Sequence, residues 1–139
     1  MRQRMVIDAS ATLAWLFEEG AIGKQIGAIL ADADRVAPSL WQLEVVNAIL
    51  VKERRKLLTV ERGIQLLELL EDWGVEIIAQ PPARALKQLA ARARPHQLTA
   101  YDAVYLETAI GQGLPLFTRD ANLRSAALRV GVPLISETR

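Results

Sequence analysis

Residues 6–10 read Val-Ile-Asp-Ala-Ser, so a short apolar segment runs directly into the carboxylate of Asp8. A carboxylate at the end of a buried segment must be paired, hydrated or bound to a metal, because it is costly to remove a lone charge from water. Short apolar runs of this kind form strands that are buried on both faces of a parallel sheet. The sequence predicts five such strands, centred on residues 6–7, 36–37, 75–78, 116–118 and 134–135.

Helical signals fill the stretches between these predicted strands. Ser39 with Gln42 predicts a capping box, Thr59 is a second helix start, and Gly74 is a left-handed stop. Strands that alternate with helices imply right-handed crossovers and a doubly wound α/β sandwich, with residues 1–139 as a single domain. The predicted helices cover residues 10–17, 39–56, 59–73, 82–93, 99–110 and 122–130.

Composition excludes several kinds of site. The chain of 139 residues has no cysteine and one histidine, His96, so disulfides, thiolate zinc sites and cysteine nucleophiles are excluded and a histidine-based mechanism is disfavoured. A net charge of +1 does not by itself indicate a nucleic-acid binder. No apolar run is long enough to cross a bilayer and no signal peptide is present, so we expect a cytoplasmic protein without a membrane partner.

Four acids are candidates for chemistry. Asp8 and Asp120 follow predicted strands, at the sheet edge where open α/β folds bind ligands. Glu44 and Asp102 lie among apolar residues on two different predicted helices, whereas Glu107 is expected to face solvent. Three of them have an ordinary alternative: Asp8 and Asp120 can cap helices, a role favoured for Asp120 taken alone, and Asp102 fits a capping box that begins at Thr99.

A shared cation would give the two helical acids a common reason to be embedded. Two carboxylates about 4 Å apart repel by roughly 4 kcal/mol at an effective dielectric constant near 20. Ligand sets made of oxygen alone favour Mg²⁺ or Mn²⁺ over Zn²⁺. Such ions lower the pKa of bound water and offset charge on a phosphate, which is the chemistry of phosphodiester cleavage.

Four motifs in this order carry a resemblance that spans Val6 to Ile135. The series resembles the PIN-domain ribonucleases, and most closely the VapC toxins of toxin–antitoxin pairs. The segments with YDAxY and TxD patterns are the most specific. The four motifs are VIDAS at 6–10, PSLWQLEVVNA at 38–48, LTAYDAVYLETA at 98–109 and GLPLFTRDANL at 113–123.

The resemblance implies a PIN-like three-layer sandwich around a five-stranded, mostly parallel sheet, with the acids at its carboxyl end. It implies Mg²⁺- or Mn²⁺-dependent endonucleolytic cleavage of RNA that leaves a 5′-phosphate and inhibits translation. It also suggests that the hydroxyls of Ser10 and Thr118 hold an acid or a water in place, although turn and strand-end roles are equally open. The family's catalytic and metal-binding quartet is carried over onto Asp8, Glu44, Asp102 and Asp120.

Partners are expected on two surfaces. The basic run Arg54, Arg55 and Lys56 is a candidate RNA contact, although cations at a helix end and solvated charge runs are common. A second basic cluster, Arg84, Lys87, Arg92 and Arg94, precedes Asp102, and we expect one of the two clusters to line the RNA groove. Leucine-rich helices offer more apolar surface than one sheet face needs, and the resemblance suggests that a homodimer and a VapB-type antitoxin cover it.

The sequence leaves three other functions to consider. A phosphohydrolase with Asp8 as its nucleophile is disfavoured, because the usual second aspartate two residues on is replaced by Ser10. A phosphoacceptor signalling domain is disfavoured because its adjacent acidic pair is missing. A non-catalytic PIN-like binding or scaffold module, in which the acids only cap helices and form salt bridges, is the main alternative.

Overall fold

Four parallel strands form one sheet in the computed structural model, which describes residues 2–18, 20–79 and 85–137. The strands are β1 (Gln3–Ile7), β2 (Ala33–Pro38), β3 (Val75–Ile78) and β4 (Leu116–Phe117), in the spatial order β3-β2-β1-β4. All three pairings are parallel. The first three strands proceed in one direction across the sheet and β4 then pairs on the other side of β1. The strand order therefore reverses between β1 and β4, which is where open α/β sheets bind ligands.

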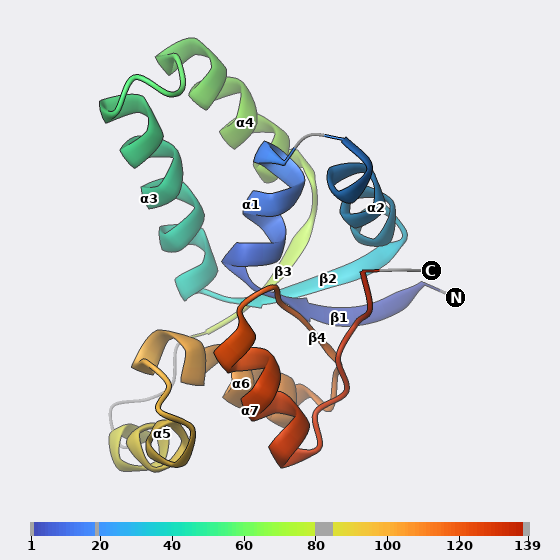
Figure 1. The fold of residues 1–139 in the computed structure, drawn as a ribbon, viewed down its shortest axis with the longest axis vertical. Coiled ribbons are helices and arrows are strands. Elements are labelled where there is room, and N and C mark those ends of the chain that lie inside the picture. The colour runs from blue at the N-terminus through green and yellow to red at the C-terminus, as the bar shows by residue number, and fades with distance from the viewer. Residues whose placement is uncertain (1, 19, 80–84, 138–139) are drawn as a thin grey trace.

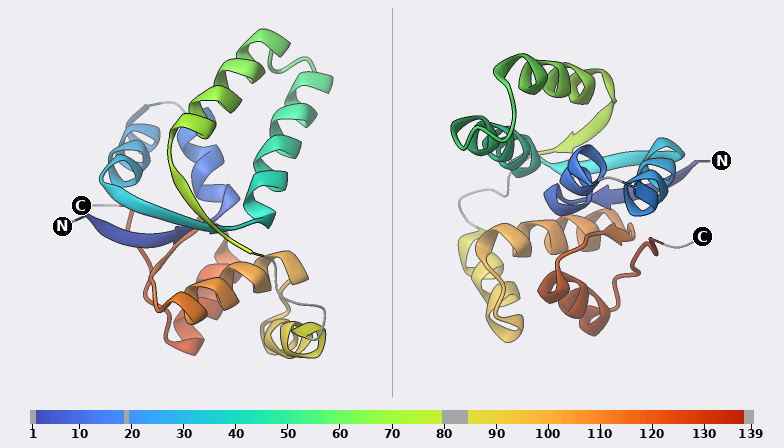
Figure 2. Two further views of the ribbon diagram at one scale, coloured as in Figure 1. Left: turned by 180° about the vertical axis from the view of Figure 1, so that it is seen from behind. Right: turned by 45° about the horizontal axis from the view of Figure 1, so that its top comes forward.

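Helices cover both faces of this sheet and make three layers (Figure 1). One face carries the helices α1 to α4, with α3 and α4 as a hairpin that extends beyond the sheet, and the other carries α5 to α7 (Figure 2). The predicted α/β class is confirmed. The helices are α1 (Ala9–Phe17), α2 (Gly20–Ala31), α3 (Leu40–Arg54), α4 (Val60–Asp72), α5 (Leu86–Ala93), α6 (Ala100–Gln112) and α7 (Ala121–Val130), and a short 3-10 helix η2 (Arg94–His96) follows α5.

The predicted fifth strand is reduced to a single bridge. Leu134 pairs in parallel with Leu116 on β4. Leu116 donates its N–H to the carbonyl of Pro133, and Ile135 donates to the carbonyl of Leu116. Pro133 has no N–H of its own, which limits ladder pairing on this side. Among the described residues the sheet therefore has four strands rather than five.

Local signals place most of the helix ends. The side chain of Thr59 accepts from the N–H of Arg62 at the start of α4, and Gly74 adopts a positive φ of 75° after that helix, as predicted. The predicted capping box at Ser39 is wrong, because Ser39 already has helical φ and ψ and its side chain makes no cap hydrogen bond. Pro82, the predicted start of a later helix, lies outside the described residues.

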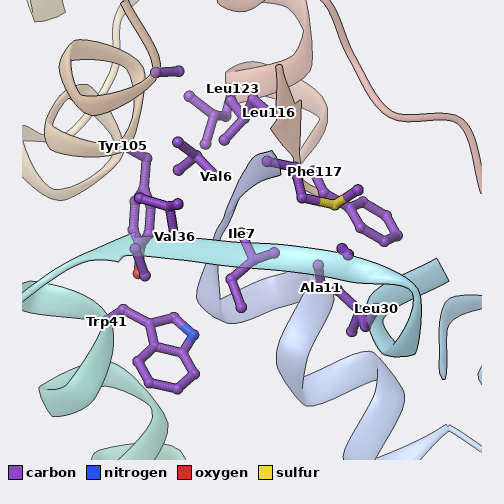
Figure 3. Close-up of a cluster of buried hydrophobic side chains, with 14 of the residues drawn as sticks. Val6, Ile7, Ala11, Leu30, Val36, Trp41, Tyr105, Leu116, Phe117 and Leu123 are labelled. Atoms are coloured by element: carbon purple, nitrogen blue, oxygen red, sulfur yellow. The ribbon is translucent and has the colours of Figure 1, made fainter. Parts of the chain in front are cut away.

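Large side chains from the two helical layers pack against opposite faces of the sheet (Figure 3). Tyr105 of α6 and Trp41 of α3 lie on opposite sides of β2 in this view, and both are buried. The indole N–H of Trp41 donates to Thr12 Oγ1 at 2.9 Å, and Trp15 stacks on Trp73 with ring centroids 4.6 Å apart. Trp41 is thus a core residue, and Trp15 and Trp73 are partly buried against the core. No helix in the described part of the chain has the length and apolar character needed to span a membrane.

Candidate active site

Asp8 lies at the strand-order reversal, directly after β1, and is only 4% exposed. It is the N-cap of α1, and its Oδ1 accepts hydrogen bonds from the N–H of Ala11 at 2.9 Å and from the hydroxyl of Ser10 at 2.7 Å. The hydroxyl of Thr118, just after β4, donates to Oδ2. Three donors therefore fix both oxygens of this buried carboxylate.

The two hydroxyls also connect Asp8 to the segment after β4. Ser10 Oγ accepts from the N–H of Arg119 at 2.9 Å, and Thr118 Oγ1 accepts from the N–H of Asp120 at 3.0 Å. Ser10 and Thr118 thus lie beside Asp8, as the sequence predicted. These contacts join the first turn of α1 to the start of α7, and their part in any reaction stays a prediction.

Asp120 is the N-cap of α7, with Oδ2 accepting from the N–H of Leu123 at 2.8 Å. The alternative that Asp8 and Asp120 cap helices is therefore correct as a description of local structure. It does not exclude a second role, because a carboxylate offers about four acceptor positions on two oxygens.

Glu44 and Asp102 come from α3 and α6. Glu44 lies in the second turn of α3, and its Oε1 accepts a hydrogen bond of 2.5 Å from the hydroxyl of Tyr105. Asp102 lies in the first turn of α6, where its N–H donates to the Thr99 side chain that caps the helix. Both acids are only partly exposed.

Electrostatic interactions join all four acids. Burial raises the pKa of Asp8 from 3.8 to about 6, against the three hydrogen bonds that lower it and with a smaller raising effect from Asp102. Burial also raises the pKa of Glu44, with Asp102 adding to it. The pKa of Asp102 is raised by burial and then by Asp120. Asp102 therefore lies within electrostatic reach of the other three predicted residues.

The donor set fits a hard cation, because every acid here offers oxygen ligands and the carboxylates repel one another. As arranged, however, no group of three or more Asp, Glu or His side chains in residues 2–18, 20–79 and 85–137 is close enough to hold a metal ion. Asp120 faces a backbone amide and Glu44 faces a phenol. These bonds occupy Oδ2 of Asp120 and Oε1 of Glu44, so uptake of an ion requires the carboxylates to move closer together through their other oxygens.

The basic run lies away from these acids. Arg54 ends α3, and Arg55 and Lys56 follow it, all exposed at the far end of the α3–α4 hairpin (Figure 1). At 1.5 Å per residue, Arg54 is about 15 Å along the helix axis from Glu44. The structure does not bring this group into the acidic site, and RNA contact by it stays a prediction.

Sequence reasoning missed one residue of the site and misjudged another acid. Tyr105 was not singled out, although it follows Asp102 by one helical turn and so shares its face. Glu107, expected to face solvent, forms an ion pair with Arg92 of α5 and is 21% exposed. Arg92 is therefore paired within the fold.

An apolar hollow adjoins Glu44 on the outer face of α3. Leu43 and Tyr101 on its wall are 69% and 61% exposed. In α4, Leu66 and Leu70 belong to the core whereas Val60, Ile64 and Leu69 are exposed, so the excess apolar surface expected from the sequence lies on both α3 and α4. The wall of this hollow is made of Leu40, Gln42, Leu43, Glu44, Val46, Asn47, Leu50 and Tyr101.

Comparison with known proteins agrees with this fold and motif order. A profile of the family described as PIN domain matches residues 5–128. The chain is 30% identical over 120 residues to "Ribonuclease VapC3" of Pyrobaculum aerophilum, over 86% of this chain and 92% of that protein. The chain therefore belongs to the PIN domain family. The resemblance to VapC proteins that the four motifs indicated is confirmed.

Two solved structures share the fold. PAE2754 from Pyrobaculum aerophilum superposes with a TM-score of 0.66 at 22% identity, over 89% of this chain and 79% of that one. FitAcB from Neisseria gonorrhoeae gives a TM-score of 0.68 at 19% identity, over 96% and 97%. At these identities the likeness concerns the fold.

Proposed function

We propose that this chain is a divalent-metal-dependent endoribonuclease that acts as the toxin of a VapBC-type toxin–antitoxin pair. Its relative bears the name ribonuclease, and the observation that carries the proposal is that Asp102 lies within electrostatic reach of Asp8, Glu44 and Asp120 near the strand-order reversal. Caps and salt bridges alone do not explain why Asp102 lies within electrostatic reach of three further acids, since that arrangement opposes folding without a counter-ion.

The proposed site assigns roles to the chain's own groups. A divalent ion, when bound, supplies the acidity that activates water and the positive charge that offsets a phosphate. Asp8, Glu44, Asp102 and Asp120 would hold that ion. Ser10 and Thr118 keep both Asp8 oxygens oriented through their hydroxyl protons.

The partners belong to the same proposal. A VapB-type antitoxin and a second copy of this chain are the proposed occupants of exposed apolar surface such as that around Leu43 on α3. Single-stranded RNA is the proposed substrate, with translation inhibited through its cleavage. The alternative, a non-catalytic PIN-like module, keeps the same fold and the same surfaces but needs no metal.

Substitution of Asp102 by Asn separates these two functions. In the nuclease, Asp102→Asn removes Mn²⁺-dependent RNA cleavage and the rise in melting temperature that Mn²⁺ gives the wild type, while the apo fold persists without the repulsion. Asp72→Asn, an exposed change at the end of α4, is the matched control and should behave as the wild type. The measurements are thermal melting with and without Mn²⁺ and digestion of RNA.

Two results would reject the nuclease proposal. One is a wild-type protein whose melting temperature ignores Mn²⁺ and that leaves RNA intact, as a scaffold module would. The other is an Asp102→Asn variant that cuts RNA as fast as the wild type, which would remove Asp102 from the site.

A further inference from the structure

Tyr105 of α6 forms a hydrogen bond with Glu44, one of the four acids of the proposed site. Its hydroxyl donates to Glu44 Oε1 at 2.5 Å, across 61 residues of sequence, and so ties α6 to α3. The same hydroxyl lies near enough to the backbone N–H of Ala9, in the first turn of α1 beside Asp8, for that amide to lower the pKa of Tyr105. One phenol group therefore reaches three elements that carry acids of the site.

The position of this hydroxyl is set by the core. Tyr105 is 2% exposed, and its ring packs among the buried side chains beside Val36 (Figure 3). A ring held this way has little freedom to turn, because protein interiors are closely packed. Glu44 differs, since it lies on a half-exposed stretch of α3 next to the open hollow around Leu43. The tyrosine is therefore the more constrained partner in this pair.

We propose that Tyr105 is a positioning residue, whose hydroxyl holds Oε1 of Glu44 so that Oε2 is presented to the divalent ion of the acidic site. The inference rests on the proposed function. A carboxylate has two oxygens, and a phenol has one proton, so the hydrogen bond leaves Oε2 free of Tyr105. Groups that hydrogen-bond to metal ligands orient them, and their loss commonly weakens metal affinity by about 10- to 100-fold.

A purely structural role would look different. If the hydroxyl only satisfied a buried phenol, its removal would lower thermal stability while leaving the Mn²⁺ affinity of the folded protein unchanged. In the positioning role, its removal weakens Mn²⁺ binding, and RNA cleavage recovers toward the wild-type rate as Mn²⁺ is raised to saturation.

The test measures Mn²⁺ affinity, by electron paramagnetic resonance of free Mn²⁺, on the full chain and four variants. The variants are Tyr105→Phe, Glu44→Gln, the double variant, and Ser125→Ala as a control that also removes a hydroxyl. Ser125 is an exposed residue of α7, so the loss of its hydroxyl should leave Mn²⁺ affinity unchanged. We expect Tyr105→Phe to raise the Mn²⁺ dissociation constant about 10- to 100-fold. In the Glu44→Gln background the same change should add little, because Tyr105 acts through Glu44.

The possible outcomes distinguish failure of the role proposed for Tyr105 from failure of the proposed metal-dependent nuclease function. If the wild type binds no Mn²⁺, or Glu44→Gln binds it as well as the wild type, the metal site itself is wrong and the role of Tyr105 falls with it. If Glu44→Gln loses affinity while folded Tyr105→Phe keeps it, only the role of Tyr105 is overturned. Equal further losses in both backgrounds would likewise overturn it.

If Tyr105→Phe does not fold, a measurement on the wild type tests the proposal without any variant. A buried phenolic proton that donates to a carboxylate exchanges slowly and can be followed by proton NMR. We expect the Tyr105 hydroxyl signal to persist when diamagnetic Mg²⁺ is added. Its loss on Mg²⁺ binding would show that the bond breaks in the loaded site, which contradicts the proposal.

Discussion

The hydroxyl of Thr118 donates a hydrogen bond to Oδ2 of Asp8, although 110 residues separate the two in the chain. The contact follows from the sheet, because Ile7 and Phe117 are register partners on β1 and β4 and the next residue of each strand enters the site. This hydroxyl, that of Ser10 and the Ala11 amide all favour the ionised carboxylate, yet burial outweighs them and leaves the pKa of Asp8 at about 6.

That pKa predicts how stability depends on pH. Asp8 is protonated more readily in the folded chain than at its ordinary pKa of 3.8, so the folded state binds more protons between about pH 4 and pH 6. The free energy of unfolding should therefore fall by about 3 kcal/mol as pH rises through this window, because the pKa of Asp8 is raised from 3.8 to about 6. Glu44 and Asp102, whose pKa values are also raised, act in the same direction. Urea unfolding with a chelator present measures this.

Asp8→Asn is the control for the pH dependence. It removes the titrating group, so the decline between pH 4 and pH 6 should become shallower. A free energy of unfolding that rises over this range in the wild type, or a decline that Asp8→Asn leaves unchanged, would contradict the raised pKa of Asp8.

The basic run at the end of α3 predicts a salt effect on RNA binding. Each lysine or arginine on a phosphate of single-stranded RNA contributes about 0.7 to the slope of log affinity against log salt. Changing Arg54, Arg55 and Lys56 to Ala should reduce that slope by about 2, measured in the Asp102→Asn background so that the RNA stays intact. Arg129→Ala, exposed on α7 across the sheet, is the control. If the triple variant keeps the wild-type slope, this patch does not contact RNA.

Two glycines should respond in opposite ways to alanine. A Cβ on Gly23 of α2 would lie 2.2 Å from the backbone carbonyl oxygen of Glu18, so Gly23→Ala should lower the free energy of unfolding by about 1–3 kcal/mol. A Cβ on Gly111 of α6 would meet nothing within 4 Å, and alanine favours a helix more than glycine does. Gly111→Ala should therefore raise the free energy of unfolding by about 0.5–1 kcal/mol. Denaturant unfolding of the two variants gives both signs, and a stabilised Gly23→Ala would refute the close approach at Glu18.

The sequence predicted elements whose signals are local. β3 was placed at residues 75–78 as observed, and the starts at Thr59 and Thr99 hold because a side-chain oxygen next to a backbone amide needs no distant partner. The four acids were located because an apolar strand or helix face around a charge is visible in sequence. That Asp8 and Asp120 also cap helices was equally visible, and both descriptions apply.

What the sequence did not predict depends on distant packing. Helix α2 was missed because its three glycines lower helix propensity, and the reason for two of them lies in other residues. Gly23 faces the carbonyl of Glu18 and Gly27 faces the ring of Trp15, so close approach between α1 and α2 favours glycine. The link between Tyr105 and Glu44 spans two helices and has no local signature.

The placement of Asp8 and Asp120 as the N-caps of α1 and α7 has a practical consequence for the design of an inactive variant. Alanine at either position would remove a helix-initiating group together with the charge, so lost activity would be entangled with about 1 kcal/mol of lost stability for each helix. Asparagine is about as favourable an N-cap residue as aspartate. An inert form for expression or crystallisation is therefore better built from asparagine at both sites.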